Sequence, residues 1–316
     1  MATQDRGASI ADRNRDVEVA QAAYLDRCAP GYRTRRVSWS GGTTQVIELG
    51  DGPPLLLVHG GLADAFQWGN ILSPLARRYR VLAVDRPGHG LADAFDYRGV
   101  DLLAHGRRFL GEVLDAEGLP SVPIVANSMG GLWSIAFALE HPKRVPRLIL
   151  VGLPAGIKRA LPIQLRLAAV PLLKTVVRAL MRRPTRESTR SFLKQILVAH
   201  PERLDDDLLD AVVASQIRNT PSWFTLIDRA IDSGGLKPEL ILGDRWRDLT
   251  VPTIFVWGER DAFGGPEEAE AVAATNPRFT VVRIPDAGHA PWLDDPERVL
   301  DAIHRALTPA VTAISG

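Results

Sequence analysis

The sequence predicts a doubly wound α/β fold, in which helices cover both faces of a mostly parallel sheet. Short, continuously apolar runs bounded by Gly or Pro are typical of strands buried on both sides. Helical patterns separate these runs, and the repeated order of strand, helix and strand favours parallel pairing with crossover helices. One long interval between residues 151 and 253 breaks the alternation, which indicates an inserted helical unit.

The elements follow one another in a regular order. A helix is predicted over residues 16–27, and two strands over 36–39 and 45–49 are joined by a turn at Gly41-Gly42, which predicts a hairpin at one sheet edge. Buried strands are predicted over residues 55–58, 81–84, 124–126, 148–151, 254–257 and 281–284. Helices are predicted over residues 65–78, 102–117, 130–140, 266–274 and 296–307.

The long interval sets the expected domain boundaries. We expect an N-terminal helical extension over residues 1–30, a core domain over 31–154 and 248–316, and a helical cap over 155–247. The first half of the cap is rich in Arg and Lys, and its apolar stripe predicts packing on the core. Contact of these basic helices with a membrane surface stays open. The stripe consists of Leu165, Leu167, Val170, Leu172, Leu173, Val176, Val177 and Leu180.

Composition excludes several classes of function. A chain of 316 residues, 46% of them apolar, can bury one large core or a core with an inserted domain. The net charge of +1 gives no reason to expect a nucleic-acid partner. The single cysteine, Cys28, excludes an internal disulfide and a cysteine-based metal cage, and the histidines lack metal-binding spacing. No signal-peptide pattern or long apolar run is present, which predicts a cytoplasmic protein.

A serine stands where a buried strand is followed by a helix, in residues 126–131, Ala-Asn-Ser-Met-Gly-Gly. A sharp strand-to-helix turn exposes a serine hydroxyl and needs small residues two positions before and after it. Ala126 replaces the usual first glycine at such a turn, and Gly130 supplies the second. Ser128 is therefore predicted to be a nucleophile rather than an ordinary helix N-cap.

A serine nucleophile needs a general base, and the base needs a carboxylate that fixes its tautomer. Asp261 follows one predicted strand and His289 follows the next, so both belong to the carboxyl edge of the sheet, as Ser128 does. The chain order Ser, Asp, His agrees with this architecture. We predict His289 as the base and Asp261 as the orienting acid, and prefer Asp261 to Glu259, which comes earlier in the turn.

Two further features complete the predicted site. Backbone N–H groups stabilise the oxyanion that forms on a substrate carbonyl, and we predict the amides of Gly61, in a Gly-rich segment after a buried strand, and Met129 as the donors. A substrate pocket is expected between the sheet edge and the cap. The candidates to line it are Leu62, Phe66, Trp68, Trp133, Trp223, Phe224 and Trp292.

Together with the segment 85–90, Asp-Arg-Pro-Gly-His-Gly, these motifs resemble the α/β-hydrolase superfamily, in its cap-bearing branch with serine as nucleophile. The resemblance runs from residue 36 to residue 307. It implies an eight-stranded, mostly parallel sheet, a helical cap between the sixth and seventh strands, and no cofactor. Dehalogenases and epoxide hydrolases of this branch carry Asp at the elbow, and Ser128 argues against both.

The predicted reaction is hydrolysis of a carboxylic ester or lactone of a hydrophobic small molecule through an acyl-enzyme on Ser128. An alternative is hydrolysis of a carbon-carbon bond in a ring-fission-type diketone, because such hydrolases share the Asn-Ser-Met-Gly-Gly string. They usually carry an aromatic residue after the catalytic histidine and a Gly-x-Gly-Pro loop, whereas this chain has Ala290 and Leu62-Ala63. A small-molecule receptor with little or no turnover is the third interpretation.

Overall fold

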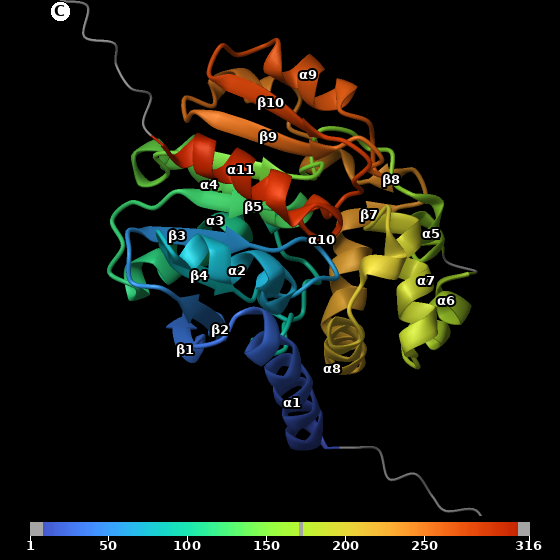
Figure 1. The fold of residues 1–316 in the computed structure, drawn as a ribbon. Helices are drawn as coiled ribbons and strands as arrows, with labels where there is room; N and C mark the ends of the chain where they lie inside the picture. Colours follow the sequence, from blue (N-terminus) through green and yellow to red (C-terminus); the bar gives the residue numbers. More distant parts are fainter. Residues whose placement is uncertain (1–8, 171–172, 309–316) are drawn as a thin grey trace, which may run out of the picture.

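A computed structural model describes residues 9–170 and 173–308 and confirms the predicted fold class. Its centre is an eight-stranded sheet in the order β1-β2-β4-β3-β5-β6-β9-β10 (Figure 1). β2 pairs antiparallel with β1 and β4, and every other neighbouring pair in this sheet is parallel. Three parts of the predicted ranges lie outside the described residues, namely 1–8, 171–172 and 309–316.

Every predicted strand lies within an observed strand. The edge hairpin is formed by β1 (Arg33–Trp39) and β2 (Gly42–Leu49). The other strands are β3 (Pro54–Val58), β4 (Arg80–Val84), β5 (Ile124–Ala126), β6 (Leu148–Val151), β9 (Thr253–Gly258) and β10 (Phe279–Ile284). Leu56 and Val58 of β3 face one hydrophobic core, whereas Leu55 and Leu57 face a second core on the opposite side. Burial on both faces is the reason why the run is apolar without alternation.

Helices cover both faces of this sheet. In Figure 1, α2 (Gly69–Ala76) and α11 (Pro296–Leu307) lie on one face, and α3 (Leu102–Ala116) and α4 (Ser128–Glu140) lie on the other. The helix predicted over residues 65–78 is divided into a 3-10 turn, Ala65–Trp68, followed by α2. The other α-helices outside the interval between β6 and β9 are α1 (Ile10–Cys28), α9 (Glu267–Ala273) and α10 (Pro291–Asp294).

Between β6 and β9, the described residues form four α-helices, a small hairpin and short 3-10 helices. The helices are α5 (Ile163–Leu167), α6 (Lys174–Met181), α7 (Arg186–Ile196) and α8 (Asp206–Ala230). The sequence pattern did not predict the antiparallel pair β7 (Ile231–Asp232) and β8 (Gly235–Leu236), because strands of two residues are too short to show a period. α1 packs against α8, so the N-terminal helix contacts the inserted unit.

The expectation that the apolar stripe of the inserted unit packs on the core is wrong for part of the stripe. Leu165 is buried, but Leu173 and Val176 are 44% and 60% exposed. Val177 of α6 packs beside Phe224 of α8, whereas Leu173 and Val176 are left largely uncovered by the residues that the structure describes. Leu172 and the side chain of Leu180 lie outside the described part of the structure. Within residues 9–170 and 173–308, no helix has the length and apolar character to span a membrane.

Candidate active site

Ser128 lies on a strained turn between β5 and α4. Its φ angle is 50°, in the left-handed region that non-glycine residues rarely adopt. A Cβ atom on Gly130 would lie 2.4 Å from the carbonyl oxygen of His59 and 2.5 Å from that of Val58, so only glycine fits where the helix passes β3. Ala126 is fully buried, and its methyl group is accommodated at the end of β5. The turn leaves Ser128 half-buried at the carboxyl edge of the sheet.

The structure brings His289 and Asp261 together from two neighbouring strand ends. His289 Nδ1 lies 2.8 Å from Asp261 Oδ2, and the two side chains are 3% and 0% exposed. The carboxylate also accepts hydrogen bonds from the backbone N–H groups of Leu153 and Phe263, at 2.9 Å and 2.8 Å. A carboxylate only accepts, so Nδ1 carries the proton and Nε2 presents its lone pair. Nε2 is buried and has no hydrogen-bond partner among the described residues.

Two residues that the sequence analysis did not single out hold this arrangement in place. The side-chain amide of Asn127 donates to the carbonyl oxygens of Val151, at 2.7 Å, and His289, at 3.1 Å, and so joins the serine turn to the histidine loop. The ring of Phe263 stacks on the His289 imidazole with centroids 4.0 Å apart. Their positions, directly before Ser128 and two residues after Asp261, are the only sequence signal that pointed to them.

The Gly-rich segment after β3 lies directly against the serine turn. A Cβ atom on Gly60 would lie 2.4 Å from Asn127 Oδ1, whereas one on Gly61 would lie 3.9 Å from the Cβ of Met129. The structure therefore places Gly61 beside Met129, as the prediction of two neighbouring amide donors requires. Leu62, the next residue in the chain, has a φ angle of 56° and is therefore strained, as Ser128 is.

Buried polar side chains hold the Gly-rich segment after β3 in place. His59 Nε2 accepts a hydrogen bond from the backbone N–H of Arg86 at 2.9 Å, and the Arg86 guanidinium donates to the carbonyl oxygen of Gly60 at 2.6 Å. Burial holds the pKa values of His59 and His89 well below the ordinary range, so both rings stay neutral. These two histidines therefore have the environment of structural residues.

A pocket opens beside Ser128 and His289, with a volume of about 90 Å³. Ser128, His289, Gly61, Leu62 and Met129 all line it. Its other walls are mostly apolar and come from both the core and the inserted helices. They consist of Asn127, Leu153, Ala155, Lys158, Leu161, Leu165, Ile196, Leu197, Leu226, Ile227, Ala230, Ile231, Leu236 and Phe263.

Of the residues predicted to line a substrate pocket, Leu62 lies at this pocket, whereas the six aromatic candidates lie elsewhere. None of Phe66, Trp68, Trp133, Trp223, Phe224 and Trp292 is among the lining residues. Their rings are buried within the core or under the inserted helices; Trp68, for example, stacks on Trp292 with centroids 4.1 Å apart. Burial of a large ring stabilises the fold wherever it occurs, so apolar character alone does not place a residue in a pocket.

The arrangement can perform nucleophilic chemistry at a carbonyl group. The half-buried Ser128 and the imidazole of His289 line one mostly apolar pocket together with Gly61 and Met129. Within the described part of the chain, no cluster of three or more His, Cys, Asp or Glu side chains is suited to hold a metal ion.

Comparisons with known proteins show the family to which the chain is similar. A model of the alpha/beta hydrolase family matches residues 55–302. One relative is a 2-hydroxy-6-oxononadienedioate/2-hydroxy-6-oxononatrienedioate hydrolase of Klebsiella pneumoniae subsp. pneumoniae, to which the chain is 32% identical over 255 residues. The aligned region covers 78% of this chain and 81% of that protein.

Solved structures show the same fold. The crystal structure of a serine hydrolase involved in carbazole degradation is similar with a TM-score of 0.70 and 26% identity, over 88% of this chain and 99% of that chain. That of a carboxylesterase from Bacillus subtilis is similar with a TM-score of 0.72 and 20% identity, over 95% and 100%.

Proposed function

This chain belongs to the α/β-hydrolase family, and from that premise we propose that it hydrolyses carboxylic esters or lactones of small hydrophobic molecules through an acyl-enzyme on Ser128. One observation carries the proposal. The buried Nε2 of His289 has no partner among the described residues, and His289 lines the same pocket as Ser128. A base with an unused lone pair beside a strained serine is the arrangement that activates a hydroxyl group.

In the proposed mechanism, His289 takes the proton of Ser128 as the oxygen attacks the substrate carbonyl. Two backbone N–H groups and the imidazole all donate to the Asp261 carboxylate, which stabilises the imidazolium that forms. The amides of Gly61 and Met129 hold the oxyanion. His289 then protonates the leaving alcohol, and a water activated by the same ring releases the acid.

The pocket restricts the substrate class. Its volume of about 90 Å³ is smaller than the cavity of roughly 150 Å³ that holds a benzene ring. Short acyl groups therefore fit without movement of the inserted helices, and long acyl chains require those helices to shift. The predominantly apolar walls favour acyl groups that carry no charge.

Hydrolysis of a carbon-carbon bond is the second candidate, because the Klebsiella relative is named as a 2-hydroxy-6-oxononadienedioate/2-hydroxy-6-oxononatrienedioate hydrolase. Substrates of that kind carry carboxylates, which require a cation in an apolar pocket. Among the described lining residues, Lys158 alone carries a fixed positive charge, and its Nζ already donates to Glu268 at 2.6 Å. This pairing favours an ester as the first choice.

The test compares wild type with Ser128→Ala on p-nitrophenyl esters from acetate to palmitate, and on a 2-hydroxy-6-oxo-dienoate. We expect turnover of the short esters by wild type and none by the variant. Turnover of the dienoate alone would replace the ester assignment with the carbon-carbon assignment. If neither class reacts, the receptor interpretation takes precedence, and ligand binding to both proteins becomes the measurement.

A further inference from the structure

Positive charge is concentrated in one stretch of the inserted unit. Between residues 157 and 194 there are ten Lys and Arg residues and one acidic residue, Glu187. The whole chain has a net charge of only +1, so the rest of the chain is net negative. Such a separation of charge within one chain creates a local field that attracts anions.

Half of these cations are neutralised by ion pairs. Lys158, Arg159, Arg178, Arg186 and Arg190 pair with acidic side chains of the inserted unit or of α9. The other five form no ion pair with any residue in the described ranges. They are Arg166, Lys174, Arg182, Arg183 and Lys194.

Large apolar side chains are exposed among these unpaired cations. Ile163 of α5 is 54% exposed, and Leu173, directly before α6, and Val176, in its first turn, are 44% and 60% exposed. Leu173 and Val176 are three residues apart, so helical spacing places them on the same side of α6, and Arg183 follows the end of this helix by two residues. α6 lies at the outer margin of the inserted unit, away from the sheet (Figure 1).

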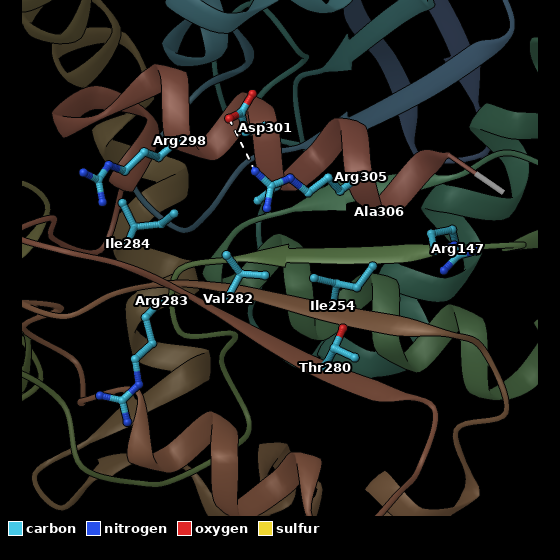
Figure 2. A pocket seen from close by; sticks show the side chains of 11 residues that line it. Arg147, Ile254, Thr280, Val282, Arg283, Ile284, Arg298, Asp301, Arg305 and Ala306 are labelled. Atoms are coloured by element: carbon cyan, nitrogen blue, oxygen red, sulfur yellow. Dashed lines mark ion pairs between the residues drawn. The ribbon is translucent and has the colours of Figure 1, made fainter. Parts of the chain in front are cut away.

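In a second basic region of the surface, most of the arginines form ion pairs. A groove between α11 and β10 is lined by Arg147, Arg283, Arg298 and Arg305 together with apolar side chains (Figure 2). Three of the four arginines are paired: Arg283 with Glu270, Arg298 with Asp295 and Arg305 with Asp301. This groove therefore provides a control for effects that depend on arginine content alone.

We propose that the outer face of α5 and α6 docks on the surface of a bilayer that contains anionic lipids. Ile163, Leu173 and Val176 enter the headgroup region, and Lys174 and Arg183 pair with lipid phosphates. Apolar side chains beside unpaired cations are the combination that binds such an interface, because burial of apolar area and attraction to anionic lipid act together. Leu165 of α5 lines the pocket, so docking brings one pocket wall close to the lipid.

The experiment is co-sedimentation of the full chain with vesicles of phosphatidylcholine alone or mixed with phosphatidylglycerol. We expect binding to the mixed vesicles only, and weaker binding as salt rises. Lys174→Gln/Arg183→Gln should reduce the partition coefficient about 30-fold, since each cation near the surface contributes about 1 kcal/mol. Val176→Ser should also weaken binding. Arg298→Gln/Arg305→Gln, which removes two paired arginines, should bind as wild type does.

Other outcomes would overturn the proposal. These are absence of binding to mixed vesicles, equal binding of wild type and Lys174→Gln/Arg183→Gln, or an equal loss in the α11 variant. A concentration-dependent dimer that the α6 substitutions abolish would assign the face to a second copy of the chain. Ser128→Ala should bind vesicles as wild type does, so that failure of the ester assignment does not affect this result.

Discussion

His289 Nδ1 and Asp261 Oδ2 lie 2.8 Å apart, and neither side chain is accessible to solvent beyond 3%. Three donors converge on the carboxylate, one from the ring and two from backbone amides of Leu153 and Phe263. This environment fixes the tautomer of the imidazole, and His289 lines the pocket beside Ser128. We therefore expect that Asp261 contributes to activity mainly by fixing the tautomer and orientation of His289, and less by its negative charge alone.

Asp261→Asn should lower kcat by about 10⁴-fold, because the amide group would donate to Nδ1 and leave the proton on Nε2, where it blocks the base. Steady-state hydrolysis of p-nitrophenyl acetate measures the effect. The matched control is Glu259→Gln, which removes the rival acid at a side chain that is 40% exposed. A larger loss for Glu259→Gln than for Asp261→Asn would assign the orienting role to Glu259.

The positive φ angle of Ser128 predicts a difference between two inactive variants. Ser128→Gly should be more stable than Ser128→Ala by about 1 kcal/mol, because glycine adopts the left-handed conformation without steric strain. Urea unfolding measures the difference. The same pair at Ser134, inside α4, should show the opposite order, with glycine about 1 kcal/mol less stable. If the glycine and alanine variants had the same order of stability at both positions, the backbone strain at Ser128 would be contradicted.

The two glycines beside Ser128 should differ in their tolerance of a methyl group. Gly60→Ala places Cβ 2.4 Å from Asn127 Oδ1, so the segment must move, and a shift of about 1 Å in a catalytic group lowers activity about 10²-fold. In Gly61→Ala the nearest atom is 3.9 Å away, and kcat/KM on the acetate ester should fall less than about tenfold. Equal losses in both variants would show that the segment does not depend on this close approach.

Two buried carboxyl groups predict a stability that depends on pH. Asp64 accepts hydrogen bonds from Gly90 and from Ser215 of α8, and Asp85 accepts from Ala65 and Leu91. Burial raises the pKa of Asp64 from 3.8 to about 6. Burial, and then the charge of Asp64, raises the pKa of Asp85 to about 7. The stability that the protonated forms contribute is therefore complete below pH 3.8 and is lost as pH rises through 6 to 7.

Asp64→Asn should remove part of this dependence. An asparagine can still accept from Gly90 and can donate to the Ser215 hydroxyl, and it carries no charge at any pH. Relative to wild type, the variant should gain unfolding free energy as pH rises from 5 to 8, because wild type then buries a carboxylate. Urea unfolding at both pH values measures the gain. Asp244→Asn, at a side chain that is 88% exposed, should show none, and equal behaviour of the two variants would contradict the burial argument.

Residue patterns predicted the sheet and the chain positions of the site. Continuous apolar runs such as residues 55–58 identify strands buried on both faces, because each side chain meets a core whichever way it points. Strand-end motifs predicted that Ser128, Asp261 and His289 belong to one sheet edge, since parallel strands direct their carboxyl ends the same way. The structure places the three there, and their chemical roles stay predictions.

Contacts between segments distant in the chain were decided only by the tertiary structure. The link from Asn127 to the carbonyl oxygen of His289 joins residues 162 positions apart. Trp292 lies in the core on Trp68 and not in the pocket, and Val176 faces solvent although its helix is amphipathic. Hydrophobic periodicity reports which side chains avoid water, but the neighbour that covers each of them is set by packing across the whole chain, which no local pattern encodes.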